Sequence, residues 1–161
     1  MPTQRRYSLK AKEAKQIIDQ INQTLKLNLE KDIGIEVVET DRGEIYLIGG
    51  KPLLFKAEKR ILPTLLFSEF IAKAPKVVVD MGAVPYVCKG ATVMAPGIVR
   101  YEGEFAAGDI VLVVDMKHGK ALAIGEALMD SATAKATKKG PIVKTLHFVS
   151  DKIWDQIKTL G

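Results

Sequence analysis

The chain has 161 residues, 47% of them hydrophobic and 27% charged, and its net charge is +5. This composition excludes a disordered chain and is sufficient for one mid-sized domain or two small ones. No window approaches the ~20 uninterrupted apolar residues of a membrane span, and the sequence does not open with a basic-then-apolar leader. We therefore expect a cytoplasmic protein without a membrane partner, whose positive charge favours a polyanionic one.

The first seventy residues predict a small α+β domain. Apolar residues recur at three- and four-residue spacing over residues 9–25, which indicates an amphipathic helix with Ser8 in position to cap it. Two β-rich runs follow at residues 34–40 and 44–50. Asp41, Arg42 and Gly43 separate them and predict the tight turn of a hairpin.

Two more elements complete this part of the chain. Residues 51–55 predict a further strand, and residues 63–71 predict a helix that Pro63 and Thr64 open. The pattern changes near residue 74, so we place the domain boundary there and expect an N-terminal α+β domain in residues 1–74.

The second part, residues 75–161, predicts short strands at close spacing, which is typical of a small barrel or sandwich. Turns are expected at residues 103–109 and 115–119, and a short amphipathic helix at residues 152–160 with Trp154 packed on the body of the protein. The strands are expected at residues 76–80, 91–94, 96–101, 109–115, 120–129 and 141–149.

One apolar segment, residues 80–98, contains too many glycines and prolines for a single long element. We expect a strand end at Gly82, two helical turns over residues 83–89 with Pro85 in the first, and a left-handed helix cap at Gly90. Gly97 then permits a sharp bend into the next strand.

Several short motifs in this order resemble a PUA domain across residues 75–149. They are D-x-G-A-V-P at 80–85, K-G-A at 89–91, A-P-G-I at 95–98, G-D-x-V at 108–111 and I-G-E-A at 124–127. The resemblance implies a mostly antiparallel pseudo-β-barrel that binds structured RNA. The predicted fold class is therefore α+β, with the N-terminal domain followed by a PUA domain with a helical tail in residues 75–161.

A narrower resemblance involves the whole chain. The P-T-L of residues 63–65 and the ending HFVSDKIW of residues 147–154 are similar to the malignant T-cell amplified sequence family, and the sequence resembles an archaeal member. The resemblance implies a role on the small ribosomal subunit in initiation, re-initiation or recycling. It also implies that the N-terminal domain docks a density-regulated-protein-like translation factor or a ribosomal protein.

The PUA resemblance further implies where RNA, either rRNA or tRNA, would bind. The small residues of the loop after the first PUA helix let an RNA backbone approach, and an acid-free lysine cluster lies in the helix of residues 134–139 and the strand of residues 140–144. The expected contacts are Tyr86, Lys89, Gly90, Ala91, Thr92, Lys135, Lys138, Lys139 and Lys144. Tyr86 and Met94 are candidates for apolar or stacking contact with an unpaired base. Both have an alternative place in the core, which we expect for Met94, and the lysines have an alternative role in solubility.

Other polar residues have structural explanations. Asp80 and Asp109 are expected to stabilise turns, Asp115 and His118 to flank a hairpin, and the single cysteine, Cys88, to pack in the core. We expect no catalytic residue, metal site or cofactor, and no DNA partner. The alternatives are an accessory RNA-binding subunit of a tRNA- or rRNA-modifying enzyme, and a small enzyme with a pocket in the N-terminal domain.

Overall fold

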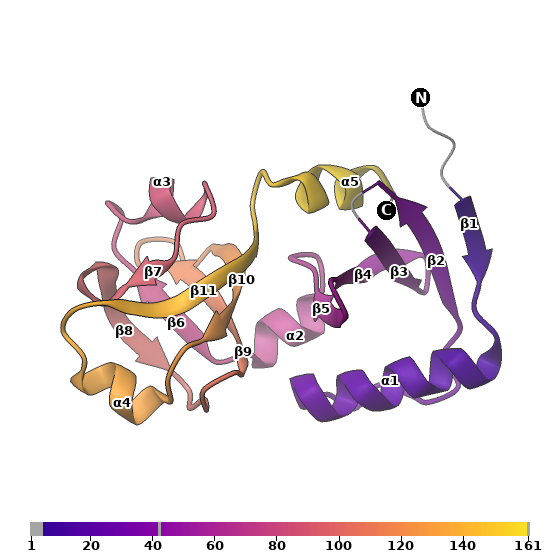
Figure 1. Cartoon of the computed structure of the whole chain (residues 1–161), viewed down its shortest axis with the longest axis horizontal. Helices are drawn as coiled ribbons and strands as arrows, with labels where there is room; N and C mark the ends of the chain where they lie inside the picture. The colour runs from indigo at the N-terminus through magenta and orange to yellow at the C-terminus, as the bar shows by residue number, and fades with distance from the viewer. Residues whose placement is uncertain (1–4, 42, 161) are drawn as a thin grey trace.

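The structure is a computed structural model that describes residues 5–41 and 43–160. The N-terminal part forms one antiparallel sheet of five strands in the order β1-β2-β3-β4-β5 (Figure 1). Its elements are β1 (Arg5–Ser8), α1 (Ala11–Leu25), β2 (Ile35–Thr40), β3 (Gly43–Ile48), β4 (Lys51–Ala57), β5 (Arg60–Pro63) and α2 (Ser68–Lys73).

The predicted helix of residues 9–25 is confirmed as α1, but the prediction that Ser8 caps it is wrong. Lys10 is the residue before the helix, and no side chain caps this end. Ser8 instead ends β1, which pairs with β2 and was not expected from the sequence. The hydrogen bonds between β1 and β2 thus outweigh the local preference of Ser8 for a helix-capping position.

The predicted hairpin is confirmed, because β2 and β3 pair antiparallel with Thr40 opposite Gly43. Arg42 of the predicted turn lies outside the described residues. The helix predicted from Pro63 is wrong at its start: Pro63 pairs with Leu54 as the last residue of β5, and the helix begins only at Ser68. The hydroxyl of Thr64 donates to the carbonyl of Pro52 at 2.7 Å, which fixes this corner to the sheet.

The second part forms a curled six-stranded sheet in the order β7-β11-β10-β9-β6-β8, as the PUA resemblance implied. All six predicted strands are present, and β6 and β9 form the one parallel pair among the described residues. The elements are β6 (Lys76–Val79), α3 (Val84–Val87), β7 (Val93–Met94), η1 (Ala95–Gly97), β8 (Ile98–Glu102), β9 (Ile110–Asp115), β10 (Ala121–Ala127), α4 (Ser131–Ala136), β11 (Pro141–Phe148) and α5 (Lys152–Leu160).

Strand β9 shows how the two parts are joined. Val111 and Val113 belong to the core inside the barrel. On the opposite face of the strand, Leu112 and Val114 belong to a second core that includes side chains of the N-terminal sheet and of α1. Both faces are covered, which explains why every residue of β9 is buried and why its sequence is apolar throughout.

Helix α5, the predicted tail, crosses back to the N-terminal sheet (Figure 1). It contacts β4, and Ile157 is completely buried in the core that contains Phe55 and other N-terminal residues. Trp154 packs against the same core, as expected. Within residues 5–41 and 43–160, no helix has the length and hydrophobicity needed to cross a membrane.

His147 connects the two domains through hydrogen bonds. Its Nε2 accepts the amide of Leu65 at 3.2 Å, and its Nδ1 lies 2.8 Å from Oδ2 of Asp151. Because Nε2 accepts, the proton of the neutral ring is on Nδ1, which donates to the carboxylate. Phe55 packs edge-on against the imidazole. The two segments that carried the narrower resemblance, residues 63–65 and 147–154, therefore meet at the domain junction.

Candidate nucleic-acid interface

The loop between α3 and β7 has the glycine-dependent conformation that the sequence predicted, although α3 itself is one turn instead of two. Gly90 has φ +88°, and the amide of Ala91 donates to the carbonyl of Tyr86 at 3.1 Å, which ends the helix in a Schellman-type cap. A Cβ at position 90 would lie 2.8 Å from Cε1 of Phe148. The backbone of the loop therefore lies directly against β11.

Further contacts fix the position of this loop on β11. The hydroxyl of Thr145 donates to the carbonyl of Ala91 at 2.8 Å, and Val93 lies opposite Val143 in the β7–β11 pair. These contacts bring five of the predicted residues together on one surface, and all but the half-buried glycine are exposed. We call them the β11 strip: Lys89, Gly90, Ala91, Thr92 and Lys144.

The other three predicted lysines lie elsewhere. Lys135 is on α4, whose N-terminus is capped by Asp130 accepting the amide of Thr133 at 2.7 Å. The helix ends at Ala136, so the expectation that residues 134–139 are helical is wrong, and Lys138 and Lys139 lie in the link to β11. We call these three residues, Lys135, Lys138 and Lys139, the α4 cluster.

The α4 cluster and the α3–β7 loop lie at opposite ends of β7 (Figure 1). The amide of Ala95, after β7, donates to the carbonyl of Gly140 at 2.9 Å, while Ala91, before β7, is bonded to Thr145. Ala91 and Ala95 are four residues apart along the chain, so their Cα atoms are separated by at most about 13 Å. The predicted site is therefore an elongated band along the β7–β11 edge rather than a single cluster.

The lysines of this band are free of ion pairs. Within residues 5–41 and 43–160, no carboxylate lies within ion-pair distance of any lysine of the β11 strip or the α4 cluster. Other cations are paired, among them Lys31 with Asp19, Lys73 with Glu69 and Arg60 with Glu126. The ammonium groups of the band are thus available to phosphate oxygens, since Glu126, which lies opposite Lys144, is bound to Arg60.

Two apolar side chains accompany this charge. Tyr86, on α3, is 67% exposed and therefore lies on the surface and not in the core. The expectation that Met94 is core is wrong, since it is 46% exposed. Side chains alternate along a strand, and in the two-residue β7 it is Val93 that points inward. Cys88 packs against the barrel core, as expected.

The carboxylates considered as turn residues have that role. Asp80 accepts the amide of Ala83 at 2.8 Å, and Asp109 accepts the amide of Ala106 at 2.9 Å. Asp115 is buried and accepts the amides of His118 and Lys120, whose hydrogen bonds lower its pKa. The same turn carries two exposed lysines, Lys117 and Lys120, in the acid-free segment MKHGK.

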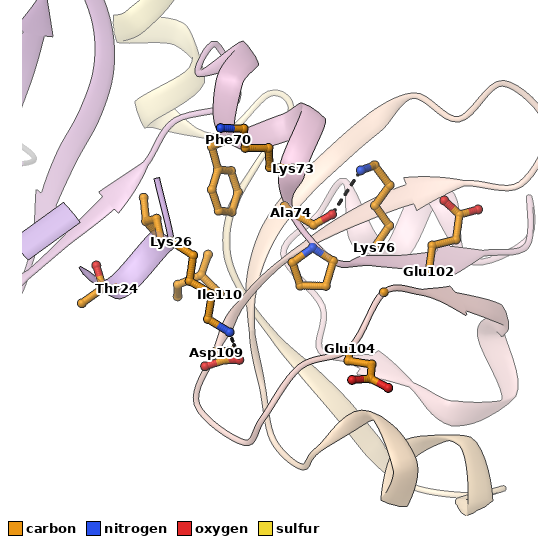
Figure 2. A pocket seen from close by; sticks show the side chains of 13 residues that line it. Thr24, Lys26, Phe70, Lys73, Ala74, Lys76, Glu102, Glu104, Asp109 and Ile110 are labelled. Atoms are coloured by element: carbon orange, nitrogen blue, oxygen red, sulfur yellow. Dashed lines mark hydrogen bonds and ion pairs between the residues drawn. The ribbon is translucent and has the colours of Figure 1, made fainter. Parts of the chain in front are cut away.

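A hollow of about 350 Å³ lies at the domain junction (Figure 2). Its charges are largely balanced: Lys26 lies 3.9 Å from Asp109 of the other domain, and Lys76 donates to the carbonyl of Ala74 at 3.1 Å. Glu102 and Glu104 add negative charge to its rim. This arrangement fits a junction between domains better than a site for a polyanion.

Comparison with known proteins agrees with the fold. Residues 75–149 match the PUA domain, and residues 5–69 match a domain of unknown function, DUF1947. Translation machinery-associated protein 20 of Saccharomyces cerevisiae is 30% identical over 156 residues, which cover 92% of this chain and 86% of that protein. Malignant T-cell-amplified sequence 1-A of Xenopus laevis is 31% identical over 149 residues, 86% of this chain and 82% of that protein. The chain belongs to the malignant T-cell-amplified sequence family.

The family has archaeal relatives with the same architecture. The crystal structure of a hypothetical protein from Pyrococcus horikoshii OT3 aligns with a TM-score of 0.80 and 35% identity, over 95% of this chain and 99% of that one. Family membership and the PUA domain predicted from the sequence are thus confirmed. The two segments that first indicated the family, residues 63–65 and 147–154, include residues that hold the domains together.

Proposed function

We propose that this protein binds structured RNA of the small ribosomal subunit, with or without tRNA, and acts in the cytoplasm in translation initiation, re-initiation or recycling without catalysing a reaction. The observation that carries the proposal is the band of unpaired lysines along the β7–β11 edge, at the point where Gly90 brings the backbone to the surface. The name of the yeast relative, translation machinery-associated protein 20, supports the connection with translation.

RNA would be held mainly through its phosphates. The β11 strip offers ammonium groups on a loop with little side-chain bulk, so that an RNA backbone can approach closely. The α4 cluster lies toward the other end of the same edge, so one helical RNA would contact both groups of lysines. The N-terminal domain is left to dock a protein, such as a density-regulated-protein-like factor.

The decisive test is a triple charge reversal in the α4 cluster, K135E/K138E/K139E. Each lysine that contacts a phosphate contributes to the salt dependence of binding, so we expect affinity for small-subunit RNA to fall at least about tenfold and the slope of log K against log salt to flatten by about two. Binding is measured by filter retention between 50 and 200 mM salt, and circular dichroism checks folding.

The matched control is K10E/K12E/K15E, which changes the net charge equally at exposed positions on and beside α1. This control should bind RNA within about twofold of the wild-type protein. A folded α4 variant with unchanged affinity would remove the α4 cluster from the site. Crosslinking in cells tests the biological target: recovery of a modifying enzyme in place of ribosomal subunits would favour the accessory-subunit alternative.

A further inference from the structure

Strand β8 is the last strand of the barrel sheet, and in the described part of the chain it pairs with β6 alone (Figure 1). The carbonyls of Pro75 and Val79 accept amides from β9 and from the residue after it, so Val77 between them also directs its peptide groups toward β9. Tyr101 lies opposite Val77. Its amide and carbonyl therefore point away from β6, toward the outer edge of the sheet.

These outward groups have no partner within residues 5–41 and 43–160. No hydrogen bond joins a described residue to the amide, the carbonyl or the hydroxyl of Tyr101, whose ring packs against Phe105. Ile98 lies opposite Val79, so its peptide groups face outward as well. Its amide donates to Ala95, which leaves the carbonyl available. A strand edge with available donors and acceptors is a template for one more strand.

A hollow of about 380 Å³ lies between this edge and α4. Ala95, Ile98 and Ala134 supply apolar surface to its lining. A bulge at Val99 shifts the pairing of β8 with β6, and a bulge re-aims the side chain that it carries. Val99 is accordingly 45% exposed at the hollow and does not enter the barrel core. The hollow can therefore take an apolar side chain from an added strand.

The charge around the hollow is positive. Arg100 contributes from β8 and Lys135 from α4, and none of the described residues that line the hollow is acidic. Lys135 has no carboxylate within ion-pair distance in the described part of the chain. Arg100 is 3.1 Å from Glu102, an exposed pair of the kind that contributes little. Carboxylates of a ligand would therefore be attracted to both walls.

We propose that the edge of β8 and this hollow bind an extended acidic segment of a protein partner, which adds a strand to the barrel sheet. A peptide residue opposite Tyr101 makes two backbone hydrogen bonds, the next outward carbonyl accepts another, and one apolar side chain of the segment enters the hollow. Glutamates or aspartates on either side of that residue approach Arg100 and Lys135. We call this site the β8 groove.

The backbone groups favour a peptide over RNA as the occupant. Phosphate oxygens accept hydrogen bonds but donate none, so a phosphate on this edge would leave the carbonyls of Ile98 and Tyr101 unpaired. A strand offers donors and acceptors in alternation and satisfies both kinds of group. The inference is independent of the RNA-binding function and adds a protein ligand to the barrel domain.

The test uses a fluorescein-labelled peptide of seven residues, two glutamates at each end of a valine-threonine-valine centre. Fluorescence anisotropy should give a Kd below about 1 mM for the wild-type protein. The same peptide with N-methyl groups on its three central residues keeps its charge but loses these backbone donors, so it should bind at least about tenfold more weakly. On saturation with the unmodified peptide, the amide of Tyr101 should exchange with deuterium at least about tenfold more slowly by NMR.

Charge is tested separately. K135Q should weaken peptide binding about twofold to fivefold, whereas K12Q, at an exposed lysine of α1, should not change it. Absence of binding at 1 mM, equal affinity for the N-methylated peptide, or equal affinity for a peptide with lysines in place of glutamates would overturn the inference and leave the RNA-binding proposal intact. Protection of the Tyr101 amide by small-subunit RNA and not by the peptide would assign the edge to RNA and contradict the inference.

Discussion

At the scale of single residues, glycines set how closely segments approach one another. Gly125 lies on β10, where the pairing with β11 shifts register, and a Cβ there would lie 2.4 Å from Cγ1 of Val143 and 3.0 Å from the carbonyl oxygen of Lys144. Gly34, in contrast, has open space around it. The glycine in the I-G-E-A motif is thus explained by close packing between β10 and β11.

We predict that G125A destabilises the protein by about 1–3 kcal/mol, because a methyl group forced into this contact must displace β11. Urea denaturation measures the difference in unfolding free energy. The control is G34A, which adds the same methyl group without a neighbour and should change stability by less than about 0.5 kcal/mol. Equal effects of the two substitutions would contradict the packing explanation.

At the scale of elements, Asp151 organises the turn between β11 and α5. Its Oδ2 accepts Nδ1–H of His147 and the amide of Phe148, both at 2.8 Å, and its Oδ1 accepts the amide of Trp154 at 2.6 Å. Burial raises the pKa of Asp151, but the hydrogen bonds from the imidazole and from the two amides outweigh burial and lower it. One carboxylate thus starts α5 and orients the histidine that bonds to Leu65.

This lowered pKa gives a predicted pH dependence. A carboxyl group whose folded-state pKa lies below its unfolded value stabilises the protein above the unfolded pKa, near 4, and loses that contribution as the pH falls through the folded pKa. D151N should therefore be less stable than wild type by about 1–3 kcal/mol at pH 7. The difference should shrink below about pH 4.

Thermal unfolding monitored from pH 3 to pH 7 measures this dependence. The matched control is D155N, an exposed aspartate on the same helix, and its curve should follow that of the wild type. If D151N and the wild type differ by the same amount at every pH, the carboxylate charge is not the source of the stabilisation.

At the scale of the whole molecule, a shared core makes the two domains one body. Leu112 on β9 is completely buried in the core that also contains Phe55 of the N-terminal sheet and Ile157 of α5. Exposed ion pairs such as Lys26–Asp109 and Arg60–Glu126 also cross the junction, but surface pairs contribute at most about 1 kcal/mol each. The apolar contact therefore dominates the coupling between domains.

We predict that the chain unfolds in a single transition and that L112A lowers its stability by about 2–5 kcal/mol without separating the domains. Trp154, the only tryptophan, reports on the junction by fluorescence, and far-UV circular dichroism reports on both domains. The two signals should move together in L112A. L128A, at an exposed leucine, is the control with little effect, and two resolved transitions in the wild type would contradict the prediction.

Local patterns in the sequence were sufficient for much of this fold and for part of the site. Alternating or continuous apolar runs predicted all six PUA strands, three- and four-residue spacing predicted α1, and glycine chemistry predicted the left-handed cap at Gly90. These features depend on interactions between residues close in sequence. The same applies to the turn carboxylates Asp80 and Asp109, whose hydrogen bonds reach only three residues along the chain.

Long-range contacts decided the rest. Strand pairing explains β1, β5 and the exposure of Met94. The roles of His147 and Asp151 depend on a hydrogen bond between residues that are 82 positions apart in the sequence. The parallel pairing of β6 and β9 brings Lys120 close to Cys88. The sequence by itself determined α1, the β2–β3 hairpin and the six PUA strands, because propensity and periodicity are local. Only the tertiary structure decided which lysines share a surface and which helix covers which sheet, since those depend on how distant segments pack.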